Sequence, residues 1–428
     1  MEVKKRIFTL ILSFMLLGSF IPARADVIGL TLDEAIDMAL TYNLDLQAKR
    51  KELGVAKEDI KIANRLQNPR VVGNFLIGQV RLGNSSQVGL DVPVEFMKRG
   101  PRKKVAKAKY SIAQNKIREY EHDLKIDIMK AYFDVLYLKS IVSIMEDRKN
   151  LFEEMANVAK NKPAKSDNYN IELLQSDIRY KRMMIELNQA KANLLSAQFH
   201  LNKVINMEKT ENMYDALETS LFSEDLSILS ISLLPYEIIE KIAMKYSYSL
   251  RIAEYDIKRA EAEVTVAKSQ RIPNFSVAGG YAWQATFRGD GNNWPGAFWG
   301  ASMDIPMLYF YGPDVRKAGL ILEKSKMDKA SFENKLKIAL KQDYNNFKYA
   351  KENMEYYREI MQESRDILEM SKERYSKGKT TFLNLLIVEN NHQQTLQEYL
   401  KAMGLYYSAY LNLMHNTGHD VLLQEEIF

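Results

Sequence analysis

The apolar positions along most of this chain recur at steps of three and four residues, which is the spacing of one face of a helix. The clearest run forms a seam interrupted only at Lys149, comprising Ile117, Tyr120, Leu124, Ile128, Ala131, Val135, Leu138, Val142, Met145, Phe152, Ala156 and Ala159. Such a seam is typical of long helices that pack side by side as a coiled coil. At 1.5 Å per residue, a helix of about sixty residues is about 90 Å long.

Four short segments break the helical pattern and alternate between apolar and polar residues, which predicts strands. They form two pairs, at 71–80 with 87–96 and at 274–287 with 297–308. In each pair one face is apolar, and the other carries polar residues such as Asp91 and Asp304. This pattern suits two structures, a half-buried sheet in a soluble protein or the wall of a barrel with lipid outside and water inside.

The chain contains two similar halves. Residues 33–69 align without a gap with residues 237–273, and both segments end in proline, which stops a helix of about 35 residues. A strand pair, a Gly-Pro helix start, a very long helix and a returning helix follow in each half. We therefore predict a first structural repeat at 26–205, a less regular segment at 206–235, and a second repeat at 236–428.

Aromatic residues gather around the second strand pair and include all three tryptophans of the chain: Tyr281, Trp283, Trp294, Trp299, Tyr309 and Tyr311. Trp and Tyr concentrate where an apolar band meets water, so this cluster favours a membrane girdle. A soluble sheet covered by the helices remains the alternative. Four strands cannot close a barrel, which needs about eight. An open sheet edge in lipid leaves backbone groups unpaired, so transmembrane strands imply an oligomer that shares one barrel.

The N-terminus has the features of an export signal. Three basic residues at 4–6, an apolar run at 7–20 and Ala-Arg-Ala at 23–25 predict a signal peptide that is removed after Ala25. An uncleaved anchor is the alternative, but a run of about 14 apolar residues is short for a spanning helix. The chain has no cysteine, which excludes disulfides and a lipid-modified N-terminal cysteine. The charge of +5 falls to +2 after cleavage, which does not indicate nucleic-acid binding.

Together these features resemble the TolC family of outer-membrane efflux proteins over residues 30–415. The best local matches are residues 30–46, the Gly-Pro-Arg at 100–102 and residues 374–386. The resemblance implies a mainly α fold with a small β part, in which three chains share a 12-stranded outer-membrane β-barrel and form a hollow periplasmic cylinder of helices. It also implies docking to a periplasmic adaptor (membrane fusion) protein and an inner-membrane pump.

In this family the turns at 160–168 and 376–384 form the periplasmic tip, where the channel closes and the adaptor docks. The resemblance assigns that role to Ser166, Asp167, Tyr375, Gly378, Lys379, Thr381 and Asn384. The charged latch of the family is largely absent, because Thr380 replaces its arginine and its ring-forming aspartates fall on Asn384 and Ile387. Ordinary turn chemistry is the alternative, with Gly378 ending a helix and Thr381 or Ser166 capping one.

The chain shows no catalytic, cofactor-binding or metal-binding pattern. The Gly-Lys-Thr-Thr at 378–381 lacks the preceding glycine of a phosphate-binding loop, because Glu373 stands there. His415 and His419 are four apart, but Gly418 interrupts the helix between them. The basic run at 98–109 follows a strand, which favours a collar near anionic lipid over a nucleic-acid site.

We therefore expect a non-enzymatic outer-membrane channel for efflux or type I secretion, with a long periplasmic extension and a bore lined by polar strand residues such as Asp91 and Asp304. The alternative is a soluble periplasmic coiled-coil scaffold. The sequence does not identify the transported substrate, the pump or the adaptor.

Overall fold

The computed structural model describes residues 27–75, 85–95, 97–161, 169–207, 213–221, 234–284 and 294–418. The predicted signal peptide at 1–25 lies outside these ranges. The chain divides into a larger unit, Leu44–Asp127 with Ser227–Phe428, and a smaller unit, Met1–Asn43 with Ile128–Leu226. The fold is mainly α with few strands, as the sequence predicts.

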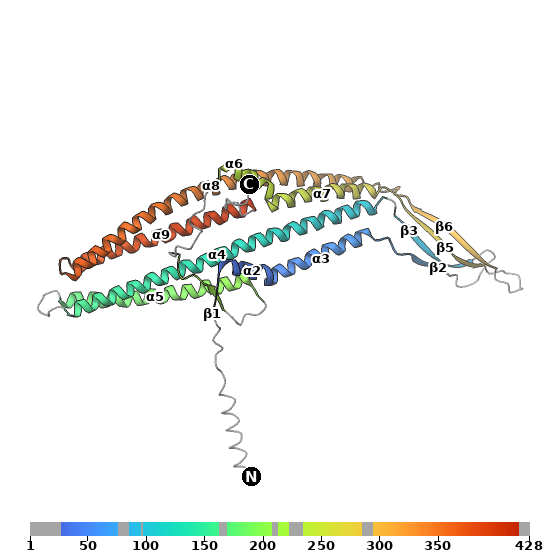
Figure 1. Cartoon of the computed structure of the whole chain (residues 1–428). Helices are drawn as coiled ribbons and strands as arrows, with labels where there is room; N and C mark the ends of the chain where they lie inside the picture. The colour runs from blue at the N-terminus through green and yellow to red at the C-terminus, as the bar shows by residue number, and fades with distance from the viewer. Residues whose placement is uncertain are drawn as a thin grey trace, which may run out of the picture. The chain divides into compact units, whose positions relative to one another are not determined.

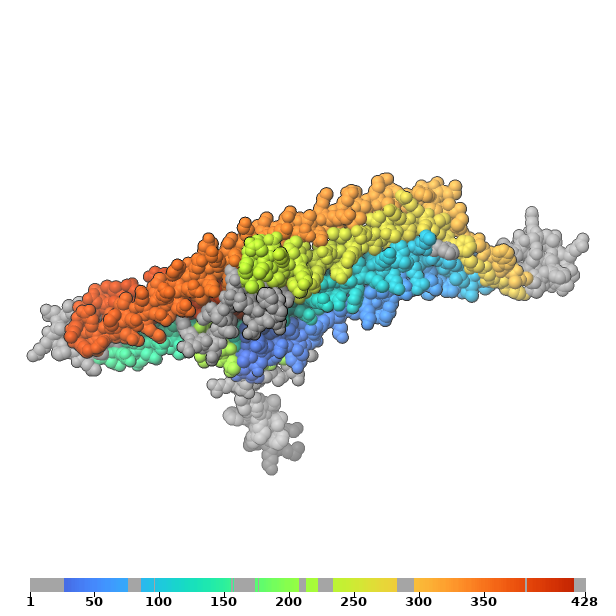
Figure 2. Space-filling view, turned by 45° about the horizontal axis from the view of Figure 1, so that its top comes forward, coloured from blue at the N-terminus to red at the C-terminus, as the bar shows by residue number. Residues whose placement is uncertain are grey.

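The larger unit is built on long helices. It holds α3 (Leu44–Asn64), the first part of α4 (Arg99–Asn161), α6 (Tyr236–Tyr246), α7 (Tyr248–Ser269), α8 (Gly312–Ser376) and α9 (Phe382–Thr417). The returning helix α9 packs along α8, and α7 packs along the first part of α8 (Figure 1). Phe347 of α8 is fully buried, and its ring centre lies 5.0 Å from that of Tyr406 on α9. Figure 2 shows α7 in yellow beside α8 in orange.

A four-stranded antiparallel sheet continues beyond the ends of α3, α4, α7 and α8 (Figure 1). Its strands are β2 (Arg70–Asn74), β3 (Ser85–Val94), β5 (Asn274–Gln284) and β6 (Trp294–Asp304), in the order β2-β3-β5-β6. Both predicted strand pairs are present, and residues 76–80, 96 and 285–287 of the predicted strands lie outside the described residues. The pairing of β3 with β5 joins the two pairs into one sheet.

The smaller unit contains α2 (Leu32–Tyr42), the later part of α4, α5 (Tyr169–Ile205) and two short strands, β1 (Val27–Leu30) and β4 (Met213–Ala216). The two strands pair in parallel. The hydroxyl of Tyr132 on α4 donates to the Leu30 carbonyl at 2.8 Å, and Lys139 pairs with Asp215 at 2.9 Å. The sequence does not reveal these strands, because four residues are too few to show an alternation.

The prediction of one continuous helix of about 35 residues in each half is wrong, because each of these segments forms two helices. The first break lies at Asn43, whose side-chain amide donates to the carbonyls of Val204 and Ile205 at 3.0 and 3.1 Å. The second lies at Ser247, whose hydroxyl accepts from the Leu250 amide at the start of α7. Asn and Ser side chains compete with the backbone for hydrogen bonds, which favours caps over helix interiors.

The order of elements occurs twice, as α2-α3-β2-β3-α4-α5 and as α6-α7-β5-β6-α8-α9. The duplication of the sequence itself, with repeats at 26–205 and 236–428, stays a prediction.

Candidate functional site

The four-stranded sheet has one face that is apolar from β3 to β6. The register places Leu90 of β3 opposite Gly279 of β5, and Gly279 opposite Trp299 of β6. The neighbouring positions on this face are also apolar and include Val88, Val92, Val277, Tyr281 and Met303. Trp299 is 88% exposed, Met303 53% and Leu90 52%. A contiguous apolar surface of this kind marks a site that contacts lipid or another protein.

The opposite face of the sheet is polar. Arg70 of β2 lies opposite Asp91 of β3, and its Nη2 is 2.7 Å from Asp91 Oδ2. Asp91 Oδ1 has no hydrogen-bond partner among the residues that the structure describes. Asp304 of β6 is exposed and lies opposite Asn274. Both aspartates predicted to face the bore are therefore on the polar face, although Arg70 compensates the charge of Asp91.

Phe298 is an aromatic exception on the polar face, and the sequence pattern does not explain it. Its ring covers Gly280 of β5 and Gly89 of β3, which are paired in register. A Cβ at Gly280 would lie 2.7 Å from the Phe298 ring and 2.2 Å from the Val88 carbonyl oxygen. A Cβ at Gly89 would lie 2.8 Å from the same ring. The two glycines thus let one ring cover two adjacent strands, which fixes the register of β3, β5 and β6.

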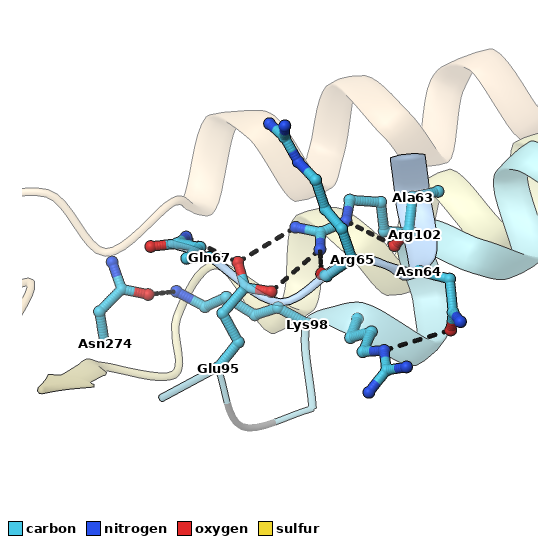
Figure 3. Close-up of polar contacts among 9 residues, drawn as sticks. Ala63, Asn64, Arg65, Gln67, Glu95, Lys98, Arg102 and Asn274 are labelled. Carbon is cyan, nitrogen blue, oxygen red and sulfur yellow. Dashed lines mark hydrogen bonds and ion pairs between the residues drawn. The ribbon is translucent and has the colours of Figure 1, made fainter. Parts of the chain in front are cut away.

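Arg102 connects the sheet to the helices (Figure 3). Its guanidinium binds the two carboxylate oxygens of Glu95, just after β3, at 3.1 and 3.0 Å. The same group donates to the carbonyls of Ala63 at 2.9 Å and Arg65 at 3.1 Å, at the end of α3. One side chain in the first turns of α4 therefore holds the end of β3 and the end of α3 together. The bidentate pair gives this contact a defined geometry.

The surroundings of Glu95 favour its ionised form. Its side chain is 6% exposed, and burial alone raises its pKa. Hydrogen bonds from Arg102 and Gln67, with the positive charges of Arg102 and Lys98, lower the pKa below the ordinary value overall. Gln67 donates to the carboxylate at 2.8 Å, and Lys98 donates to Asn274 at 2.6 Å (Figure 3). Glu95 therefore stays charged opposite Arg102 at neutral pH.

An exposed apolar belt follows β6 and consists of Ile305, Met307, Leu308, Tyr309 and Phe310. The guanidinium of Arg271, just after α7, lies 5.5 Å from the centre of the Phe310 ring. Tyr309 contacts the Tyr311 ring and donates its hydroxyl to Asp314 at 2.6 Å. Of the predicted girdle, Tyr281, Trp299 and Tyr309 are exposed. The side chains of Trp283 and Trp294 lie outside the described residues, and the girdle role stays a prediction.

The turn between α8 and α9 is explained by helix capping. Gly378 has φ +67°, and its amide donates to the Tyr375 carbonyl at 2.9 Å. The Lys379 amide donates to the Arg374 carbonyl at 2.8 Å, which completes a Schellman motif. The Thr381 hydroxyl caps α9 by accepting from the Asn384 amide at 3.3 Å. The capping roles expected for Gly378 and Thr381 are therefore confirmed.

The gating and docking roles of the tip residues stay predictions. Tyr375 is buried, whereas Lys379 and Asn384 are exposed. Ser166 and Asp167 lie outside the described residues, as does His419. His415 lies 3.1 Å from Asp123, and the hydrogen bond to that carboxylate raises the pKa of His415.

In the described part of the chain, no helix has the length and apolar character needed to cross a membrane. The same residues contain no group of three or more His, Cys, Asp or Glu side chains that could hold a metal ion.

Several outer-membrane channels and a metal-resistance protein are among the known proteins to which this chain is similar. No protein-family profile matches the chain. It is 23% identical over 256 residues to the cobalt-zinc-cadmium resistance protein CzcC of Cupriavidus metallidurans, and this match covers 58% of the chain but only 57% of CzcC.

The structural matches extend over nearly the whole chain. The crystal structure of CusC, described in terms of transmembrane channel formation, aligns with a TM-score of 0.74 and 13% identity over 92% of this chain and 94% of CusC. The CmeC outer membrane channel of Campylobacter jejuni aligns with a TM-score of 0.71 and 15% identity over 90% of this chain and 85% of CmeC. The resemblance noted in the sequence is therefore confirmed in three dimensions, and the chain has the fold of the outer-membrane factor channels.

Proposed function

We propose that this protein is the outer-membrane exit duct of a tripartite efflux or type I secretion system. The observation that carries the proposal is the exposed apolar face of the four-stranded sheet, in a chain with the fold of outer-membrane channels. In water this exposed apolar face would promote aggregation, whereas in a bilayer it contacts the lipid tails. The soluble scaffold is less favoured, because it requires the helices to cover the sheet and Trp299 is 88% exposed.

The proposal requires several copies of the chain. Strands β2 and β6 are the edges of the described sheet, and each edge carries unpaired backbone groups. In lipid every such group must be satisfied within the protein. Edge-to-edge pairing of β2 with β6 of the next copy solves this problem. In a homotrimer the four strands of each chain make a closed barrel of 12 strands.

Transport through this duct is passive. The polar sheet face lines the bore, where the Arg70–Asp91 pair and exposed Asp304 keep the wall hydrated. A barrel of 12 strands is wider than the 8-stranded barrels whose interior side chains can fill, because the diameter grows with the number of strands. Energy comes from an inner-membrane pump, to which a periplasmic adaptor connects the duct at its helical tip. The protein catalyses no reaction in this mechanism.

The experiment is extraction of the mature protein from outer membranes with a mild detergent, followed by light scattering and conductance across planar bilayers. A detergent-dependent three-chain particle that conducts ions supports the duct. A monomer found in the soluble fraction without detergent contradicts it and favours the periplasmic scaffold.

Divalent transition-metal ions are the first cargo to test, because one relative is named for cobalt, zinc and cadmium resistance. A strain that lacks this protein should become sensitive to these ions and regain resistance when the gene is restored. Unchanged tolerance to all three ions would exclude them as the main cargo while leaving the duct itself untouched.

A further inference from the structure

A shallow groove of about 470 Å³ lies between α4 and α7, near the ends of both helices that adjoin the sheet. Small buried side chains, Ala108 and Ala262, leave space between the helices. Exposed lysines line the groove, two from α4 (Lys104 and Lys107) and one from α7 (Lys258). Glu261 supplies the acidic group of this lining, so the groove carries a net positive charge.

These three lysines have no ion-pair partner among the residues that the structure describes. A neighbouring cation on α7 does have such partners. Arg259 of α7 pairs with Asp256 at 2.8 Å and with Glu263 at 2.7 Å. Lys258 instead has its ammonium 4.7 Å from the centre of the Tyr255 ring. An uncompensated group of lysines around a groove is suited to an anionic ligand, because each ammonium acts as a mobile point charge.

The end of the groove that carries Lys104 lies near the membrane surface if the sheet is in the membrane. Helix α4 begins at Arg99, so Lys104 lies about 8 Å along the helix at 1.5 Å per residue. The exposed apolar belt at 305–310 occupies the link between β6 and α8. Each headgroup layer of a bilayer is about 5 to 8 Å thick. Long lysine side chains near a membrane surface extend their ammonium groups toward this layer.

We propose that this groove binds the phosphate group of an anionic membrane lipid, for which phosphatidylglycerol is the probe. The inference rests on the proposed function, because a membrane-inserted sheet is what brings lipid headgroups to the groove. The apolar belt contacts the acyl chains, and the three lysines neutralise the phosphate. The groove thereby sets the depth at which the duct sits in the bilayer.

The experiment measures lipid retention by native mass spectrometry on the full mature protein, extracted in mild detergent and supplied with phosphatidylglycerol or phosphatidylcholine. The test variant combines Lys104→Gln, Lys107→Gln and Lys258→Gln. The control combines Lys326→Gln, Lys335→Gln and Lys341→Gln, which removes the same charge from exposed positions further along α8. We expect the test variant to retain at least about tenfold less phosphatidylglycerol. The control should match the wild type, and neither change should alter phosphatidylcholine retention.

Equal phosphatidylglycerol retention by the test and control variants would overturn the proposal. So would protection of Lys104 from amine-reactive labelling by inorganic phosphate alone, with phosphatidylglycerol giving no protection, because free phosphate would then be the ligand. Conductance of the same samples separates this inference from the proposed function. A wild type that conducts but shows no lipid preference overturns the lipid site alone, whereas a wild type that neither inserts nor conducts overturns both.

Discussion

At the scale of single residues, two contacts decide how the sheet is held. The Arg102 guanidinium donates hydrogen bonds to a buried carboxylate and to two backbone carbonyls from different segments, and the Phe298 ring covers a pair of glycines. The sequence shows the residue types but not these contacts. Arg102 lies in a basic run, where an arginine is ordinarily solvated, and its partner Glu95 becomes visible only when β3 and α4 are folded.

Removing the Arg102 side chain should destabilise the protein. We expect Arg102→Ala to lower the free energy of unfolding by about 2 kcal/mol, because the buried Glu95 carboxylate loses its charged partner. Lys61→Ala, which breaks an exposed pair with Glu58, should cost well under about 1 kcal/mol. Denaturant unfolding of the detergent-solubilised protein measures both values. Similar values for the two variants would show that the contact does not hold the junction.

The contribution of the Glu95–Arg102 pair should depend on pH. Because the folded pKa of Glu95 is lowered, the stabilisation is present above the ordinary value of 4.5 and is lost as the pH falls through the folded pKa. The difference in the free energy of unfolding between the wild type and Arg102→Ala should therefore become smaller at acidic pH. A difference that stays constant from pH 7 to pH 3 would contradict this assignment.

Two glycine substitutions on the same sheet face should behave differently. Gly280→Ala places a Cβ 2.2 Å from a backbone oxygen of β3, so we expect it to prevent normal pairing of β3 with β5. Gly300→Ala on β6 meets no atom within 4 Å and should be tolerated. The amount of heat-modifiable, detergent-resistant protein in outer membranes measures the difference. Normal assembly of Gly280→Ala would show that the Phe298 cover is not needed.

At the scale of elements, aspartate substitutions in the strands test whether one face of the sheet contacts lipid and the other does not. Asp at Leu90 or Met303 places a carboxylate on the apolar face, at a depth-dependent cost of roughly 2 kcal/mol within a bilayer. Asp at Gln87 or Ser302, on the polar face, should cost little. We expect membrane assembly to fail only for the first pair. Equal tolerance at all four positions would exclude lipid from the apolar face.

The α8–α9 helix pair contains a buried histidine that should make it sensitive to acid. Burial of His392 lowers its pKa, and the positive charges of Arg365 and Lys372 lower it further. Near pH 6.5, the ordinary pKa of histidine, the unfolded chain binds a proton at His392 more readily than the folded chain does. The stability of the folded state should therefore fall as the pH drops through 6.5. We expect His392→Gln to reduce this slope in thermal unfolding. An equal slope in the wild type and in His392→Gln would contradict this assignment.

The sequence predicts elements well where a local rule acts. Strict alternation predicts both faces of the strands, because successive side chains of a strand point to opposite sides. Pro69 and Pro273 predict the helix ends only to within four or five residues, because α3 ends at Asn64 and α7 at Ser269. Gly378 marks the turn, because its positive φ favours glycine. The breaks at Asn43 and Ser247 are missed because the helical pattern continues through them. The parallel pair β1–β4 and the pairing of β3 with β5 depend on long-range contacts, which no local pattern contains.

At the scale of the whole molecule, the two sheet edges predict how copies join. The chain has no cysteine, so engineered cysteines cross-link without background. A cysteine at Val72 on β2, combined with one at Gly300, Ser302 or Asp304 on β6, should give covalent products up to the trimer. Cysteines at Gln87 and Ala282, which are paired within the sheet, should cross-link inside one chain. Intermolecular products from the second set and none from the first would contradict the edge-to-edge assembly.

The pairing of β3 with β5 also has a consequence for biogenesis. β3 precedes α4, α5, α6 and α7 in the chain, whereas β5 follows them, so four helices must emerge before β3 can pair with β5. During that interval the edge of β3 that later pairs with β5 is unpaired, and Val88, Leu90 and Val92 are exposed to water. Such exposed strand edges are prone to aggregate, and non-local pairing is slow. If the protein is the proposed outer-membrane duct, the newly exported chain should therefore depend on periplasmic chaperones until its second half arrives.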